Sequence, residues 1–187
     1  MDNIGLPALL GVIVGASITY LYNMSLEQRK AQRERVNLAK LLLADIETLW
    51  DRYYQVLGNF IEGYEDLETP PTLTCPLNQN YFVIFDSNAT KIGMFEPEAA
   101  NKVVRLYTLA KTYLDTIRGY EERIKEYKKW NDIKKTPNNN QGFVVDDNLK
   151  QIFSELQITF QIIKQEHDGL KGLLAEVKEA LKNISIK

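Results

Sequence analysis

This sequence has few of the side chains on which catalysis and metal binding most often depend. It contains one histidine, His167, and one cysteine, Cys75. A zinc site built from His and Cys needs several such ligands, and an internal disulfide needs two cysteines. We find no Gly-rich phosphate loop, nucleophile elbow or kinase motif. We therefore expect no enzymatic activity, no metal and no cofactor.

An excess of charge is also lacking. The chain of 187 residues carries 23 Lys and Arg against 25 Asp and Glu, for a net charge of −2. Binding to nucleic acid depends on an excess of basic side chains, so no nucleic-acid partner is expected. The lone cysteine fits a reducing compartment.

One stretch, Ile4 to Tyr22, lacks charged side chains altogether. As a helix its nineteen or so residues span about 28 Å, close to the ~30 Å hydrocarbon core of a bilayer. This predicts a transmembrane anchor over residues 1–24 and a separate domain over residues 25–187. A cleaved signal peptide or a buried helix of a soluble domain are the alternatives. The first needs basic residues before the run, and the second normally shows a polar face.

The residues that flank this stretch predict its orientation. Basic side chains follow it at Arg29, Lys30 and Arg33, and none precede it. Basic flanks stay on the cytoplasmic side, so we expect a single-pass protein with its N-terminus outside and its main domain in the cytoplasm. A face of small residues is predicted to pack transmembrane helices together, although glycine is common in such helices anyway; it consists of Gly11, Gly15 and Thr19.

Apolar side chains recur every seven residues in three long segments. They lie within residues 26–66, within 97–130, and from a cap at Asp146 or Asp147 to about Ile184. Such repeats predict an all-α fold, in which three long helices form an antiparallel bundle of coiled-coil character. His167 lies in one of these rows. It is either a satisfied polar position in the core or a pH-sensitive one.

The segments between the predicted long helices are less regular. Three prolines forbid a helix over residues 67–79. Residues 81–95 fit a short buried strand or a short helix, and the helix is favoured because no partner strand is evident. Pro97 suits the first turn of the second long helix.

The antiparallel topology makes a prediction about the second loop. If the first helix leaves the membrane and the second returns, residues 128–143 lie near the bilayer. Basic residues there attract anionic lipids, but they also occur at ordinary solvated helix ends. The predicted membrane-surface contacts are Arg29, Lys30, Arg33, Lys128, Lys129, Trp130, Lys134 and Lys135.

Two phrases resemble a known group of proteins. They are FDSNATKIGMF, at Phe85–Phe95, and VVRLYTLAK, at Val103–Lys111. Their order over roughly residues 41–120 resembles a loose family of uncharacterised bacterial single-pass membrane-anchored helical proteins. The resemblance implies that architecture and the inner (plasma) membrane of a bacterium, but no activity. A small polar site is possible in the first phrase, or its residues make turn and cap hydrogen bonds: Asp86, Asn88, Lys91 and Gly93.

Taken together, these features predict a membrane-tethered, non-catalytic interaction or scaffold module. Its expected partners are the lipid bilayer and either further copies of the chain or a cytoplasmic protein. The alternative is a membrane-acting effector or sensor of a bacterial stress or phage response. An enzyme that uses the segment from Asp86 to Gly93 is a third hypothesis, with no recognisable chemistry to support it.

Overall fold

The computed structural model describes residues 5–65, 69, 71–73, 81–136 and 142–186, and in these ranges it is helical without a strand. The short helical segment predicted within residues 81–95 is confirmed, because α3 and η2 occupy it. Cys75 and most of the predicted irregular segment 67–79 lie outside the described residues. The elements are α1 (Gly5–Tyr53), the π-helical turn η1 (Tyr54–Gly58), α2 (Asn59–Gly63), α3 (Val83–Asn88), the 3-10 turn η2 (Ala89–Met94), α4 (Pro97–Lys134) and α5 (Gly142–Ile186).

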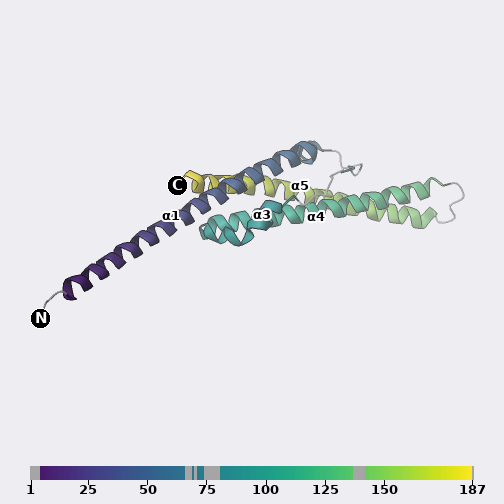
Figure 1. Ribbon diagram of the computed structural model, residues 1–187. Helices are drawn as coiled ribbons and strands as arrows, with labels where there is room; N and C mark the ends of the chain where they lie inside the picture. The colour runs from purple at the N-terminus through teal and green to yellow at the C-terminus, as the bar shows by residue number, and fades with distance from the viewer. Residues whose placement is uncertain (1–4, 66–68, 70, 74–80, 137–141, 187) are drawn as a thin grey trace.

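Three long helices make up the bundle, as predicted, and α5 runs antiparallel to both others (Figure 1). Between α4 and α5, Lys102 pairs with Glu176 at 3.7 Å and Lys134 pairs with Asp146 at 2.7 Å. As the residue numbers rise along α4, those of the α5 partners fall. Asp146 therefore lies within α5 and pairs across the hairpin, instead of capping the helix as predicted.

Helices α1 and α4, in contrast, run parallel, and the predicted antiparallel arrangement of this pair is wrong. Three contacts at increasing positions in both helices show it: Arg35 with Glu96 at 3.1 Å, Asp45 with Tyr107 at 2.7 Å, and Tyr53 with Tyr113 at 2.7 Å. Residues 64–82 separate the end of α2 from the start of α3. A segment of this length can span the bundle, which allows α4 to begin beside the start of the packed part of α1.

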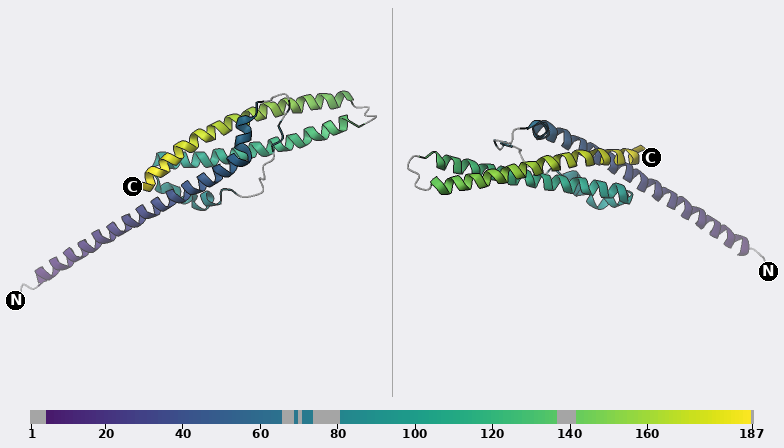
Figure 2. Two further views of the ribbon diagram at one scale, coloured as in Figure 1. Left: turned by 90° about the horizontal axis from the view of Figure 1, so that it is seen from above. Right: turned by 180° about the vertical axis from the view of Figure 1, so that it is seen from behind.

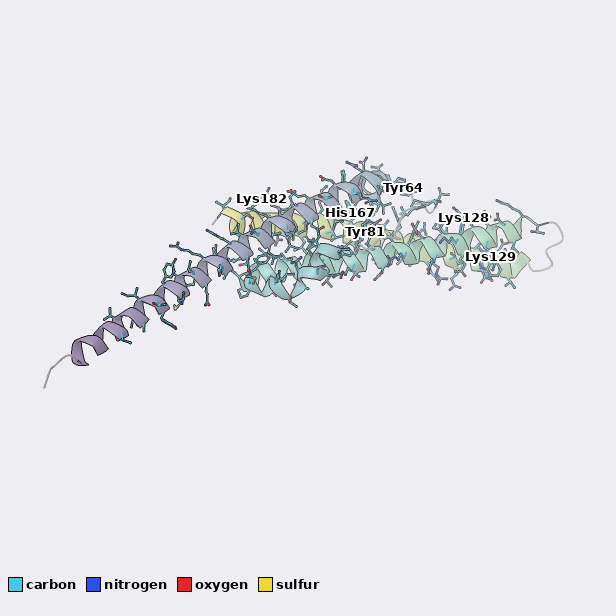
Figure 3. The ribbon with its side chains drawn as sticks, in the orientation of Figure 1. Tyr64, Tyr81, Lys128, Lys129, His167 and Lys182 are labelled. Carbon is cyan, nitrogen blue, oxygen red and sulfur yellow. The ribbon has the colours of Figure 1, made fainter. Side chains whose placement is uncertain are left out.

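This parallel arrangement places the end of α4 and the start of α5 at the opposite end of the molecule from the start of α1 (Figures 1 and 2). Lys128 and Lys129 lie at that far end (Figure 3). Arg29, Lys30 and Arg33 lie on the N-terminal part of α1. The geometric argument for a shared membrane surface therefore fails, and membrane contact by these residues stays a prediction.

The predicted transmembrane helix is wrong as well. Among the residues that the structure describes, no helix is long and apolar enough to cross a membrane. The stretch belongs to a helix that continues without a break through Glu27 to Tyr53. No helix end separates an anchor from a domain at residue 24. The predicted single-pass topology, which depends on that transmembrane helix, is therefore wrong too.

The π-helical turn η1 changes which side of the first helix faces the core. The seven-residue rows predict that Val56 and Phe60 are buried, but they are 50% and 44% exposed. The next residue along from each is buried: Leu57, which belongs to another predicted row, at 3%, and Ile61, which belongs to none, at 0%. A π-helical turn inserts about one extra residue into the helix, which rotates everything after it. The buried face therefore moves by one position at η1.

Candidate functional site

The turn η1 carries the first helix over His167 of α5. The imidazole is 1% exposed and stacks against the Trp50 ring, with 5.8 Å between ring centroids. Both of its nitrogens are occupied: Nδ1 lies 2.6 Å from the Tyr53 hydroxyl and Nε2 lies 2.9 Å from Oε1 of Glu62. His167 is therefore a satisfied polar residue in the core, which confirms one of its two predicted roles.

The hydrogen bonds form a continuous series that connects α1, α2, α4 and α5. The Tyr53 hydroxyl also lies 2.7 Å from the Tyr113 hydroxyl of α4. With a neutral imidazole that donates from Nε2 to Glu62, Nδ1 accepts from Tyr53, and the oxygen of Tyr53 accepts from Tyr113. Each of these side-chain polar atoms then has a hydrogen-bond partner. We call Tyr53, Glu62, Tyr113 and His167 the histidine network.

Glu62 sits at the outer end of the histidine network, where its carboxylate is 28% exposed. Besides His167, it accepts from the ammonium of Lys171 at 2.7 Å and from the hydroxyl of Tyr54 at 2.8 Å. The hydrogen bond from His167, and then those from Lys171 and Tyr54, lower the pKa of Glu62 to about 2. The bond to this carboxylate in turn raises the pKa of Tyr54. Glu62 is therefore an anion at neutral pH.

A carboxylate, an imidazole and a hydroxyl in sequence are also the groups of a general-base catalyst. Here, however, the imidazole is covered and the hydroxyl of Tyr53 has the hydroxyl of Tyr113 as its second partner. What the network does in the structure is to join α1, α2, α4 and α5 at the π-helical turn.

Gly58 allows the rings around the histidine network to pack closely against the backbone of η1. A Cβ atom at Gly58 would lie 2.9 Å from Cδ2 of Tyr54, 3.0 Å from Cε1 of Tyr53 and 3.4 Å from Cε1 of His167. The first two distances are shorter than ordinary van der Waals contact, so a larger residue would have to push the rings apart. The histidine network therefore requires glycine at this position.

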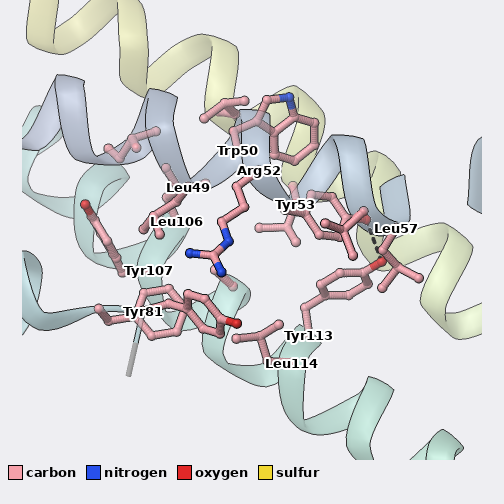
Figure 4. Close-up of a pocket in the computed structure, with 16 residues that line it drawn as sticks. Leu49, Trp50, Arg52, Tyr53, Leu57, Tyr81, Leu106, Tyr107, Tyr113 and Leu114 are labelled. Carbon is pink, nitrogen blue, oxygen red and sulfur yellow. Dashed lines mark hydrogen bonds between the residues drawn. The ribbon is translucent and has the colours of Figure 1, made fainter. Parts of the chain in front are cut away.

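A cavity adjoins the network between α1 and α4 (Figure 4). Its volume is about 130 Å³, and its walls are almost wholly apolar. Tyr53 and Tyr113 form part of the wall with their rings, while their hydroxyls engage each other. Arg52 also contributes, with its guanidinium 5.6 Å from the centroid of the Tyr81 ring.

The four residues of the predicted polar site do not converge on one point. Asp86 accepts from the ammonium of Lys111 in α4 at 2.6 Å, and Asn88 donates to the carbonyl of Ile84 in its own helix at 2.9 Å. Lys91 and Gly93 are exposed. The bond made by Asn88 is of the local, cap-like kind that was the alternative prediction. A binding role for these four residues stays a prediction.

The residues predicted to pack or to contact a membrane are mostly exposed. Gly15 and Thr19 lie on the exposed part of α1, where the Thr19 hydroxyl donates to the Gly15 carbonyl at 2.9 Å; the surroundings of Gly11 lie outside the description. Trp130, in contrast, packs partly against the bundle core. Lys134 pairs with Asp146, and Lys135 lies 4.0 Å from Asp132.

Comparisons add no relatives to this description. No family model, curated protein or solved structure matches the chain. The resemblance to bacterial membrane-anchored proteins therefore stays a prediction. Within the described ranges, no group of three or more His, Cys, Asp or Glu side chains is placed to hold a metal ion.

Proposed function

We propose that this protein is a non-catalytic helical interaction module that assembles through the N-terminal arm of α1. The arm is defined as the part of α1 that precedes Arg35. It extends beyond the bundle, away from the other helices (Figures 1 and 2). The bundle ends here because α4 begins at Pro97, directly after the Glu96 that pairs with Arg35.

The observation that carries the proposal is the exposure of apolar side chains on this arm. They point in several directions around the helix, so the arm is apolar on more than one side. A helix that is apolar all round is normally buried, and an isolated one gains most of its stability from packing. Another surface must therefore cover these side chains: Val12 72%, Val14 55%, Ile18 62%, Tyr20 68%, Leu21 63% and Tyr22 63% exposed.

We assign the arm of a second copy as that surface. The cavity of about 130 Å³ has room for a small molecule only, so the arm of one copy does not fit into the bundle of another there. An identical arm, in contrast, supplies an apolar stretch of equal length, and such an isologous contact closes into a symmetric dimer. A Cβ atom added at Gly15 would meet no other atom within 4 Å. The second arm therefore has room to approach the first closely at this position.

The test is the mass of the full chain in aqueous buffer over a range of concentrations, by sedimentation equilibrium. We expect a dimer or higher assembly for the wild type. Ile18→Lys should weaken it about 100-fold, because a buried unpaired charge costs about 3 kcal/mol or more. Ile158→Lys is the matched control, since Ile158 is 60% exposed on α5 and Ile18 is 62% exposed on the arm.

Three outcomes contradict the proposal. The wild type stays monomeric at every concentration, Ile18→Lys assembles as well as the wild type, or Ile158→Lys dissociates the assembly. Flotation with lipid vesicles is measured in parallel. A monomer that floats through its arm would show that lipid, not a second copy, covers the apolar side chains.

A further inference from the structure

The cavity beside the histidine network has the properties of a small-molecule site. It lies between α1 and α4, close to the π-helical turn, and the exposed Arg52 is one of the residues that line it (Figure 4). Its apolar lining includes several aromatic rings, which is typical of sites that take a ring-shaped ligand. Among the residues that form its walls are Trp50, Phe82, Tyr107, Leu114 and Leu174.

The size of the cavity limits its occupant. At about 130 Å³ it is slightly smaller than a cavity of about 150 Å³, which is known to hold one benzene molecule. A single six-membered ring therefore fits, and a fused ring system or an acyl chain of any length does not. Filling such a space with an apolar ring restores the packing contacts that the surrounding side chains lack.

The positive charge of Arg52, which lines the cavity, indicates which group an aromatic ligand bound there would carry. Arg52 is exposed, and its guanidinium lies over the Tyr81 ring at 5.6 Å. Among the described residues it forms no ion pair. Lys111, by comparison, lies 5.5 Å from the centroid of the Phe82 ring and forms an ion pair with Asp86 at 2.6 Å. A guanidinium presents paired donors that match the two oxygens of a carboxylate.

We propose that this cavity binds a small aromatic carboxylate, with the ring between α1 and α4 and the carboxylate on Arg52. The apolar walls hold the ring, and the guanidinium selects an anion over a neutral or cationic molecule of the same shape. The inference is independent of the proposed assembly, because the arm is not part of the cavity.

The test uses benzoate as the probe and the fluorescence of Trp50 as the signal. The chain has two tryptophans, so Trp130→Phe leaves Trp50, in the cavity wall, as the reporter. We expect a saturable change with benzoate, and weaker binding of benzyl alcohol and then benzylamine, which carry the same ring. Arg52→Gln should weaken benzoate binding about tenfold and leave benzyl alcohol unchanged, because only the charged hydrogen bonds are lost.

Two control variants separate this site from general effects of charge or folding. Arg105→Gln removes an exposed arginine of α4 that is not part of the cavity, and benzoate should bind it as it binds the Trp130→Phe parent. Ala110→Phe fills the cavity and should abolish binding of all three probes, with helicity checked by circular dichroism. The proposal is overturned if no probe gives a saturable signal, or if benzoate and benzyl alcohol bind equally and Arg52→Gln changes neither.

Discussion

The two halves of the first long helix belong to the same element but have opposite surroundings. Before Arg35, the arm exposes apolar side chains such as Ile18 and Leu21 and extends away from the other helices (Figures 1 and 2). After Arg35, residues such as Ala39, Leu42 and Ile46 are 0–4% exposed in the core. Both halves are helical, so helix formation alone does not show where the stability of this protein lies.

The difference shows that the packed half of α1 derives its stability from three-helix contacts, whereas the arm has local hydrogen bonds only. Helices in proteins are stabilised mostly by tertiary packing. Changes in the packed half should therefore unfold the molecule, and changes in the arm should alter association. The following predictions test this contrast, beginning with the largest effect on stability.

Replacement of His167 by Ala should have the largest effect, because it removes a buried ring and its two hydrogen bonds. It leaves a cavity against Trp50 and deprives Tyr53 of its acceptor. We expect the free energy of unfolding to fall by about 3 kcal/mol. Urea denaturation followed by circular dichroism measures it. A loss below about 1 kcal/mol would show that the histidine network adds little beyond ordinary surface contacts.

Gly58→Ala should destabilise the protein by about 1 kcal/mol net, because the crowding of Tyr53 and Tyr54 outweighs the better helix propensity of Ala. Gly119→Ala is the matched control, since Gly119 lies within α4 and a Cβ there meets nothing within 4 Å. This control should gain about 0.5–1 kcal/mol. If both variants are stabilised, the π-helical turn accommodates a methyl group and glycine is not required there.

Acid should weaken the histidine network through Glu62. Its pKa is lowered from an ordinary 4.5 to about 2 in the folded protein. A depressed pKa contributes stability that is fully present above about pH 5 and is lost as the pH falls towards 2. With Glu62→Gln, the free energy of unfolding should therefore depend less on pH between about pH 5 and 2. Glu98→Gln, at an exposed pair with Lys102, should reduce this pH dependence less. Equal effects would contradict a special role for Glu62.

Much of this fold follows from sequence periodicity. The rows through residues 97–130 and up to Ile184 correspond to the buried faces of α4 and α5, and His167 is a core residue as one prediction had it. Hydrophobic repeats report which side of a helix is buried. They do not report the direction of neighbouring helices, so the parallel alignment of α4 with α1 could not be read from them.

Glu62, one of the two partners of His167, was missed because of the π-helical turn. The seven-residue rows assume a constant helical repeat, and η1 breaks it between Tyr53 and Asn59. Glu62 then faces α5, although the predicted rows do not include it. One signal was present in the sequence: Leu57 and Ile61 continue the apolar rows with an offset of one residue after Tyr53. The apolar composition of residues 4–22, read alone, led to a spanning helix that the structure does not support.

The smallest effect on stability is expected in the arm. At concentrations where the chain is monomeric, Ile18→Ala should change the free energy of unfolding by no more than about 0.5 kcal/mol, as for other exposed positions. Amide hydrogen exchange sharpens the contrast, because it reports local opening residue by residue. In dilute solution the arm should exchange fast, and the core of α5 around Ile163 slowly. Raising the concentration should slow exchange in the arm alone. If the dilute arm is already as protected as α5, it is stabilised without a partner, and the two halves of α1 do not differ as proposed.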